Sequence, residues 1–372
     1  MNIGWIGEGL LALFCIVALI QFYYLLVELT GIGFSNLNEK VALTPPVSVI
    51  ICARNEYKNL TTFLPEILNQ NYPEFQVIVV NDCSWDESSK YLEEMADAYP
   101  NLKIVTLKEQ EKYPHGKKLA LTLGIKGAAY DCLLLTDADC RPASAFWLRN
   151  MATNFVSGKD IVIGYGGYHK IPGLLNKWIR FDTVYNAILY LSSALKNKAY
   201  MGVGRNLAYR KELFFLNKGF ANHYHIMSGD DDLFINETAT GSNAAVELRP
   251  DSFTYSEPVK TWNSWLHQKK RHMSTGAYYQ RSDQIFLGTY FISLSTFYLL
   301  TLILLYLKQC IVAVVLMFTI RLIIQLLVFG KGMQKLKEND LIWITPFFEL
   351  TMAFIYPFVA ASNLVFKTKT WK

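Results

Sequence analysis

Acidic side chains directly follow three short apolar runs of this 372-residue chain. Glu56 and Asp82 follow the first two, and Asp137 and Asp139 follow a later one, CLLLT. Carboxylates that a fold brings together repel one another unless a cation or a basic ligand group compensates their charge. A divalent metal ion with a phosphorylated ligand can provide this compensation, because hard cations bind carboxylate and phosphate oxygens together. The pattern predicts metal-assisted chemistry on a phosphorylated substrate.

The apolar runs have the length and composition of buried strands. Residues 47–53, VSVIICA, are rich in β-branched side chains and too short for a helix. Similar runs alternate with segments of helical spacing, which predicts βαβ units and a mainly parallel sheet buried on both faces. Ligands of such sheets bind at the carboxyl ends of the strands, where we expect the acidic side chains to gather. The predicted strands after the first are 75–80, 102–106, 132–136 and 161–163, and the predicted helices are 57–70, 87–98 and 118–129.

Each acidic residue also has a simpler explanation, since a loop Asp often caps the next helix. We expect that role for Asp86, which precedes the helical segment 87–98. Asp137 and Asp139 are different: they are one residue apart after a buried run, so they point to the same side.

Hydrophobic residues make up 52% of the chain and charged residues only 18%, and both ends carry long runs with almost no charge. The first, residues 10–27, nearly crosses a 30 Å hydrocarbon core at about 1.5 Å per residue. A cleaved signal peptide is the competing explanation, but the segment before the run has no Lys or Arg and includes Glu8, and no small-residue cleavage site follows. Three more runs of spanning length, 284–307, 309–330 and 342–366, bring the predicted membrane helices to four.

Charged and polar side chains interrupt two of these runs, with Arg321 and Gln325 in one and Glu349 in another. Two explanations stay open. Such residues can face other helices or a wet cavity and line a functional path, or they can lie near an interface and snorkel to the headgroups.

The membrane topology follows from basic residues. Lys331, Lys335 and Lys337 place their loop in the cytoplasm by the positive-inside rule, so four spans put the middle domain in the cytoplasm and both termini outside. The basic tail at 367–372 contradicts this arrangement. A kinked or re-entrant last segment around Pro346 and Pro357 would remove the conflict.

Composition also excludes several functions. The six cysteines are scattered without a CxxC pair, which argues against a disulfide scaffold or a structural zinc site. The net charge of +5 is modest and no dense basic stripe occurs, so nucleic acid is not an expected partner.

Seven motifs occur in an order and at a spacing that are specific to one family. They are VSVIICARNE, VIVVNDCSWDES, HGKKLALTLGI, LLLTDADC, GVGRNLAYRKELF, SGDDDLF and QKKRH. Over about residues 45–275 the chain resembles the large inverting glycosyltransferase family of GT-A fold, which includes cellulose synthase, hyaluronan synthase and bacterial polysaccharide or lipid glycosyltransferases. The resemblance implies a Rossmann-like α/β nucleotide-sugar domain with a mainly parallel sheet, flanked here by transmembrane helices.

The resemblance also implies roles for the residues at the strand ends. Glu56 and Asp82 match positions that hold the nucleotide base, and Lys117, or its neighbour Lys118, matches the basic position near the nucleotide. Asp137 and Asp139 match the Asp-x-Asp pair of the family, in which Asp139 is expected to bind the metal and Asp137 the nucleotide. The implied cofactor is Mg²⁺ or Mn²⁺, bridging the diphosphate of a nucleotide-sugar donor. Asn81 stands where many members have an Asp.

The run Asp230-Asp231-Asp232 resembles the acidic motif that supplies the catalytic base. A carboxylate must lie within hydrogen-bond reach of the attacking sugar hydroxyl, and only one of the three can do so. Alignment of Gly-Asp-Asp gives Asp231, the preferred base, whereas alignment of the following Leu233 gives Asp230. Another member of the run would provide the acidic start of the helix expected near Leu233.

A third set of residues resembles the QxxRW motif of processive members and the loop that binds the acceptor in this family. Gln268 is expected near the nucleotide-sugar, and Arg271 is expected to neutralise the diphosphate leaving group through its planar fork. His272 replaces the Trp that would stack on an acceptor sugar, which argues against processive synthesis. Gly204 and Arg205 look like the acceptor-side loop, although glycines in a simple turn explain that segment equally well.

The predicted organisation has three parts: an anchor and linker at 1–44, a glycosyltransferase domain at 45–280 with an amphipathic interfacial helix at about 172–198, and membrane helices at 281–372. The predicted activity is a metal-dependent inverting transfer of a hexosyl-type sugar from a nucleotide-sugar to a lipid-linked or glycan acceptor of the cell envelope. The expected location is the bacterial inner (plasma) membrane, among membrane lipids, with a cytoplasmic catalytic domain. The alternatives are a processive polysaccharide synthase and, in another class, an inactive membrane scaffold or lipid-binding protein. Neither the donor nor the acceptor can be read from these motifs.

Overall fold

The computed structural model describes residues 3–35, 43–108 and 116–365, so residues 36–42 of the predicted linker and the basic tail at 367–372 lie outside it. The contacts divide the chain into two compact units. The sheet unit comprises the described residues of Asn36–Asn176 and Ala194–Lys260. The membrane-helix unit comprises those of Met1–Ser35, Lys177–Ser193 and Thr261–Thr368.

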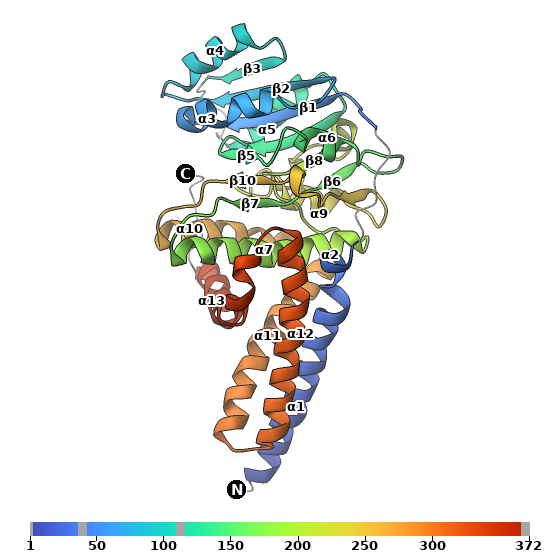
Figure 1. Ribbon diagram of the computed structural model, residues 1–372, viewed down its shortest axis with the longest axis vertical. Helices are drawn as coiled ribbons and strands as arrows, with labels where there is room; N and C mark the ends of the chain where they lie inside the picture. The colour runs from blue at the N-terminus through green and yellow to red at the C-terminus, as the bar shows by residue number, and fades with distance from the viewer. Residues whose placement is uncertain (1–2, 36–42, 109–115, 366–372) are drawn as a thin grey trace. The chain divides into compact units, whose positions relative to one another are not determined.

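A seven-stranded sheet forms the centre of the sheet unit, with strand order β3-β2-β1-β4-β8-β6-β9 (Figure 1). The first four of these strands are parallel to one another, as the apolar runs predict, while β8 is antiparallel to both of its neighbours. The strands are β1 (Val47–Ala53), β2 (Phe75–Asp82), β3 (Leu102–Leu107), β4 (Cys132–Asp137), β6 (Ile161–Ile163), β8 (Leu207–Arg210) and β9 (Ala244–Val246). The predicted mainly parallel sheet is confirmed.

A smaller three-stranded sheet follows the order β5-β10-β7. Its strands are β5 (Cys140–Pro142), β10 (Thr254–Ser256) and β7 (Gly166–Tyr168). Only Ala138 and Asp139 separate β4 of the large sheet from β5 of the small one. The Asp-x-Asp segment is therefore the turn at which the chain passes from one sheet to the other.

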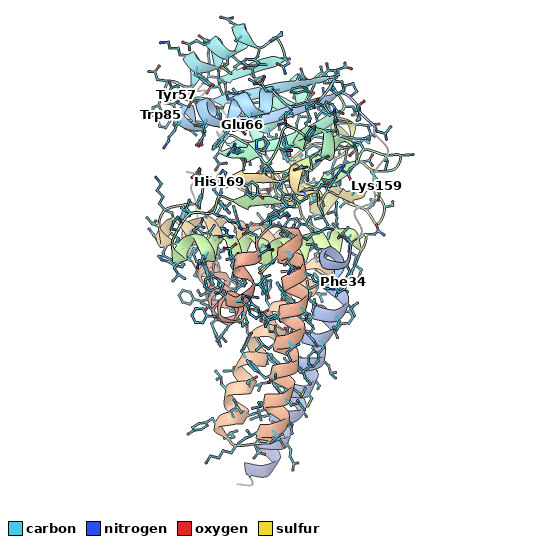
Figure 2. All side chains as sticks on the ribbon, in the orientation of Figure 1. Phe34, Tyr57, Glu66, Trp85, Lys159 and His169 are labelled. Atoms are coloured by element: carbon cyan, nitrogen blue, oxygen red, sulfur yellow. The ribbon has the colours of Figure 1, made fainter. Side chains whose placement is uncertain are left out.

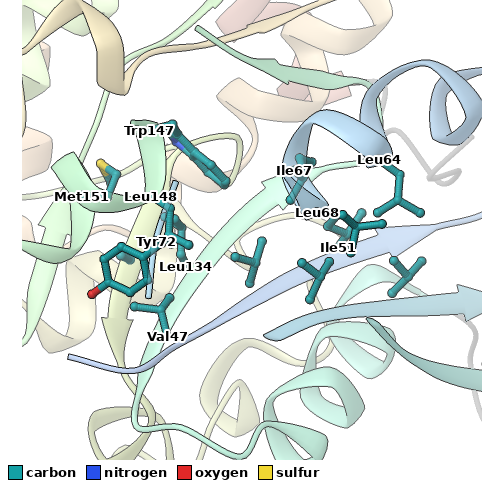
Figure 3. Packing of buried hydrophobic residues seen from close by; sticks show 14 of the residues in the cluster. Val47, Ile51, Leu64, Ile67, Leu68, Tyr72, Leu134, Trp147, Leu148 and Met151 are labelled. Atoms are coloured by element: carbon teal, nitrogen blue, oxygen red, sulfur yellow. The ribbon is translucent and has the colours of Figure 1, made fainter. Parts of the chain in front are cut away.

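Helices cover the large sheet and supply its core. Ile51 of β1 packs in one buried cluster with Leu64, Ile67 and Leu68 of α3, and Trp147 of α6 lies in the same cluster (Figure 3). Burying an aliphatic side chain of this size stabilises the fold by about 1.5–3 kcal/mol. The helices of this unit are α3 (Tyr57–Leu68), α4 (Ser88–Ala98), α5 (Lys117–Gly127), α6 (Trp147–Ala152), α8 (Lys211–Leu216) and α9 (Asp232–Thr238), with 3₁₀ turns η2 (Ala221–His223) and η3 (Pro250–Ser252).

Helix α5 lies unusually close to the sheet. A Cβ added at Gly124 would meet side-chain methyl carbons of Ile50 at 2.7 Å and of Val80 at 3.0 Å. Only glycine allows the helix backbone to approach β1 and β2 this closely. This contact fixes the position of α5, whose first residue is Lys117.

Four helices of the membrane-helix unit are long and apolar enough to cross a membrane: Gly7–Glu28, Arg281–Tyr306, Ile311–Lys335 and Asn339–Asn363. Figure 1 shows α1, α11 and α12 running side by side. The helices of this unit are α1 (Ile3–Tyr23), continued by the π-helix η1 (Tyr24–Glu28), then α2 (Gly31–Phe34), α10 (Trp262–Met273), η4 (Thr275–Tyr278), α11 (Arg281–Tyr306), α12 (Ile311–Lys335), η5 (Asn339–Ile344) and α13 (Thr345–Val365). Each of the four predicted runs overlaps one of these spans, although their ends differ by a few residues.

Arg321 and Glu349 do not snorkel. Arg321 is 1% exposed and Glu349 is fully buried, and their Nη1 and Oε2 atoms lie 2.6 Å apart. Gln21 of α1 accepts a second bond from Arg321 at 2.9 Å, and the Tyr298 hydroxyl donates to Glu349 at 2.7 Å. Of the two explanations left open by the sequence, the structure selects burial between helices.

Helix α7 (Leu174–Leu195) corresponds to the predicted interfacial helix. Its central residues, Lys177–Ser193, group with the membrane-helix unit, whereas the sequence analysis assigned the whole helix to the glycosyltransferase domain. Ion pairs account for this difference: Arg180 binds Glu338 and Asp340, and Asp182 binds Lys269 at 2.7 Å. Partners more than 80 residues away cannot be recognised from the amphipathic pattern of the helix itself. Its location in a lipid interface, like the domain boundaries, stays a prediction.

Candidate active site

The acidic turn between the two sheets brings three ligand atoms together. One side-chain ligand atom each from Asp137, Asp139 and Cys140 lies within 4.8 Å of the others. Burial and the nearby charge of Asp137 raise the pKa of Asp139 to about 6, because both disfavour a second negative charge. Two carboxylates at this spacing fit a hard divalent cation, which would relieve their repulsion. The chemistry of this donor set therefore agrees with the predicted metal site.

Lys117, at the start of α5, links two acidic segments of the site. Its Nζ lies 2.8 Å from Oδ1 of Asp137 and 3.0 Å from Oδ2 of Asp230. Although burial opposes the charged form, the carboxylates of Asp137 and Asp230 raise the pKa of Lys117 well above its usual value. Of the two lysines considered from the sequence, Lys117 is the one whose ammonium group contacts the acidic side chains.

Asp231 is held by backbone groups rather than by a cation. Its Oδ2 accepts a 2.7 Å hydrogen bond from the N–H of Gly204, and its Oδ1 accepts one from the N–H of Asp232, the first residue of α9. Burial, together with the charges of Asp230 and Asp232, raises the pKa of Asp231 to about 7. A carboxylate with this pKa is about half ionised at pH 7 and basic enough to accept a proton.

The two other carboxylates at the strand ends occupy the same edge of the sheet. In the strand register, Ala53 pairs with Asn81 and Cys52 pairs with Asp137, so β2, β1 and β4 end side by side. Glu56 is close enough to contribute to the raised pKa of Asp139. Asp82 ends β2 and is 1% exposed. The predicted gathering at one edge is present; the roles of Glu56 and Asp82 in base binding stay predictions.

Hydrogen bonds join the loops that follow β1 and β2. The N–H of Trp85 donates to Oδ1 of Asn55 at 2.9 Å, and the two carboxylate oxygens of Asp86 accept from the N–H groups of Tyr57 and Ser88. Asp86 thus caps the first turns of both α3 and α4. Burial opposes its charged form, but hydrogen bonds from the Ser88 side chain and from the N–H groups of Tyr57 and Ser88 lower its pKa. Trp85 and Tyr57 are exposed at the surface of this part of the unit (Figure 2).

Arg205 lies between the metal-ligand candidates and the small sheet. Its guanidinium donates to the carbonyl of Gly167 and covers the ring of Tyr168 at 4.4 Å. Its positive charge acts against the increase in the pKa of Asp139. Gly204 thus contacts the acidic run through its backbone N–H, and Arg205 acts on Asp139 electrostatically, while their acceptor-side roles stay predictions.

The third predicted set belongs to the membrane-helix unit. Gln268, Arg271 and His272 lie on α10 at the spacing i, i+3 and i+4, which places them on one face of the helix. Lys269 points elsewhere, since it is buried against Asp182 and Tyr356. The relation of Arg271 to the carboxylates of the sheet unit stays a prediction.

The sequence reasoning missed two contacts of the site. The Gly204–Asp231 hydrogen bond joins residues 27 apart, and no local pattern signals it. Cys52 lines a small cavity with Lys117, Asp137 and Asp230, but its place in the run VSVIICA marked it only as part of a strand. Its position one residue before the end of β1 is the signal that could have identified it.

The arrangement of two sheets around an acidic turn is that of GT-A glycosyltransferases. A mannosyltransferase from Pyrobaculum calidifontis, solved with GDP-Man and Mn²⁺, superposes with a TM-score of 0.59 over 98% of this chain and 99% of that chain, at 18% identity. Residues 48–215 match the family model of glycosyl transferase family 2. Over this segment the chain is similar to family 2 glycosyltransferases, and its fold is the GT-A fold.

Characterised and catalogued relatives agree with this assignment over part of their length. Glycosyltransferase AglE of Haloferax volcanii is 33% identical over 32% of this chain and 39% of the relative. The probable glycosyltransferase YdaM of Bacillus subtilis is 25% identical over 63% of this chain and 56% of the relative. A poly-β-1,6-N-acetyl-D-glucosamine synthase of Staphylococcus epidermidis is 31% identical over 25% of this chain and 21% of the relative. The chain thus matches at most about half the length of these relatives.

Proposed function

We propose that this protein is a membrane-bound, metal-dependent inverting glycosyltransferase that uses a nucleotide-sugar donor and a lipid-linked or glycan acceptor. The observation that carries the proposal is the position of Asp231, whose carboxylate is held by Gly204 while Lys117 links the adjacent Asp230 to Asp137. A base and a diphosphate-binding segment are thereby joined through one lysine. The GDP-Man and Mn²⁺ of the Pyrobaculum calidifontis mannosyltransferase support a nucleotide-sugar and a divalent ion as ligands.

Asp231 acts as the general base in this proposal. As the acceptor hydroxyl attacks the anomeric carbon, its proton passes to the Asp231 carboxylate, the new C–O bond forms, and the bond to the diphosphate breaks with its electron pair on the diphosphate oxygen. Attack from the face opposite the leaving group inverts the anomeric configuration. Asp230 is less suited to this role because its carboxylate is ion-paired with Lys117.

The remaining residues hold the donor. Asp139, with Asp137 beside it, would bind Mg²⁺ or Mn²⁺, which would supply positive charge to the departing diphosphate. Glu56 and Asp82 are proposed to contact the base, and Gln268 and Arg271 the nucleotide-sugar and its diphosphate. Gly204, Arg205 and His272 are proposed for the acceptor side. The four apolar helices support an integral membrane location, and we propose the bacterial inner membrane with the catalytic residues facing the cytoplasm.

Donor turnover by the purified full-length protein tests the proposal. A panel of UDP- and GDP-sugars is incubated with Mg²⁺ or Mn²⁺, and nucleoside diphosphate release is measured. Asp139→Ala and Asp231→Asn should each abolish turnover, whereas Asp97→Asn on the exposed side of α4 should leave it unchanged. Full activity in both site variants would disprove the mechanism. If the wild-type protein is active, mass analysis of lipid extracts identifies its acceptor.

A processive polysaccharide synthase is the second candidate, supported by the partial match to the Staphylococcus epidermidis synthase. His272 in place of a stacking Trp is the observation against it. Product length distinguishes the two: single additions support the proposed transferase, and long chains from one acceptor support the synthase. An inactive scaffold predicts that calorimetry detects no binding of any nucleoside diphosphate.

A further inference from the structure

Lys118 is a buried lysine that the proposed reaction does not use. It is 5% exposed and follows Lys117 in the first turn of α5. Its Nζ donates to the carbonyl oxygens of His223 at 2.6 Å and Ile226 at 2.9 Å. Burying an ammonium group is costly unless its donors are satisfied. The position is therefore expected to have a role that offsets this cost.

The two carbonyls belong to one turn. The N–H of Ile226 donates to the carbonyl of His223 at 3.0 Å, so residues 223–226 close on themselves and direct both carbonyls at Lys118. Tyr224 and Met227, in and next to this turn, are exposed. Lys118 thus attaches the turn to α5 from its buried side.

This turn lies in the segment that leads to the proposed base. We name residues 217–229 the approach loop; it ends at Gly229, immediately before Asp230 and Asp231. Left-handed backbone occurs at Lys218, Gly219 and Gly229, with φ of 57°, 63° and 93°. A non-glycine residue in this region costs about 1 kcal/mol, so Lys218 keeps its conformation only where other contacts impose it.

Consecutive lysines of α5 therefore contact the acidic run and the loop before it. Lys117 contacts the carboxylate of Asp230, and Lys118 contacts the loop that precedes it. Burial lowers the pKa of Lys118 to about 8, although the nearby carboxylates of Asp230, Asp232 and Asp231 act against this decrease. Because α5 is itself fixed against the sheet at Gly124, the position of the approach loop is set by the sheet.

We propose that Lys118 is a positioning residue, which holds the approach loop so that Asp231 keeps its hydrogen bond to Gly204. The inference rests on the proposed function, since it concerns the placement of the proposed base. Lys118 contacts neither donor nor acceptor in this account. Its loss should affect the rate of the bond-forming step more than donor binding, because a displacement of about 1 Å at a reacting group can cost about 100-fold in rate.

Hydrogen exchange of the full-length protein, followed by mass spectrometry, tests the contact without depending on activity. Lys118→Met removes the N–H donors of the ammonium group and keeps a side chain of similar length. Peptides covering 217–233 should exchange at least about tenfold faster in this variant, because the turn amides of Ala221, His223 and Ile226 lose their support. Peptides from β1 and β2 should be unchanged. Lys126→Met, on the exposed last turn of the same helix, is the matched control and should alter neither region.

Kinetics then separate positioning from a general defect. In Lys118→Met, kcat should fall about 10- to 100-fold while the KM for the donor changes less than about twofold. Lys118→Gln, whose amide can still donate to one carbonyl, should give smaller changes of both exchange and kcat. This variant replaces Lys118→Met in both measurements if Lys118→Met does not fold. Unchanged exchange in 217–233, or an equal increase over the whole sheet unit, would overturn the role of Lys118. A wild-type protein without donor turnover would overturn the proposed function instead, whatever the exchange of the loop.

Discussion

The N–H of Gly204 donates a 2.7 Å hydrogen bond to Oδ2 of Asp231. Gly204 lies just before the start of β8 in the large sheet, and Asp231 is the N-cap of α9. The bond therefore connects the segment that enters a strand with the start of a helix. It orients a carboxylate whose second oxygen is also held, by the N–H of Asp232. A base fixed in this way loses little entropy when the acceptor binds.

The rate should depend on pH through Asp231. Because the proposed base must be ionised and its pKa is raised to about 7, kcat/KM is expected to increase about tenfold per pH unit below 7 and to level off above it. Measuring donor turnover between pH 5.5 and 8.5 shows whether kcat/KM rises in this way. Asp97→Asn should retain the same profile, and a flat profile between pH 6 and 8 would exclude Asp231 as the base.

Asp231 should lower stability while it serves catalysis. Its pKa is higher in the folded protein than the ordinary value of 3.8, so folding binds a proton and stability falls as pH rises from about 4 to about 7. Asp231→Asn removes the charge and should raise the free energy of unfolding at pH 8 by on the order of 1 kcal/mol. The apparent thermal midpoint in detergent measures the effect. The difference from wild type should shrink at pH 5; a variant that is less stable than wild type at pH 8 would contradict this account.

Gly124 should be intolerant of a side chain. In Gly124→Ala the new Cβ would overlap methyl groups of Ile50 and Val80, and overpacking of this kind costs about 1–3 kcal/mol. Both stability and kcat should fall, because α5 carries Lys117. Gly127→Ala is the control in the same helix: its Cβ would have no neighbour closer than 3.7 Å, so it should leave the thermal midpoint and kcat near wild type.

The contrast between Asp137 and Lys118 explains how far the sequence predicts this molecule. Asp137 follows an apolar run whose composition fixes a buried strand, and parallel strands must end at a common edge, so its place could be predicted. Lys118 contacts a turn 105 residues away, and only the packed structure shows which side of α5 faces that turn. Arg321 is similar, since hydropathy locates it in a span but does not reveal that Glu349 and Gln21 surround it.

The buried Arg321–Glu349 pair should contribute strongly to the stability of the membrane-helix unit. Arg321→Met leaves Glu349 without its cation among the described residues, and an uncompensated buried charge typically costs about 3–5 kcal/mol. The double variant Arg321→Met, Glu349→Leu removes both charges, so it should be more stable than Arg321→Met alone. Thermal unfolding in detergent compares the three proteins. Equal midpoints for the single and double variants would contradict the cost assigned to an unpaired Glu349.

Cys310 should report the membrane topology. It is exposed in the turn between α11 and α12, at the opposite end of α12 from Lys331 and Lys335. If the lysine-rich end is cytoplasmic, as the positive-inside rule predicts, Cys310 lies on the external face of the membrane. A membrane-impermeant maleimide added to intact spheroplasts should therefore label the wild type but not Cys310→Ser. An introduced cysteine at the exposed position Asp340, in the Cys310→Ser background, should react only after the membrane is opened. The reverse pattern would place the catalytic residues outside the cytoplasm and remove their access to cytoplasmic nucleotide-sugars.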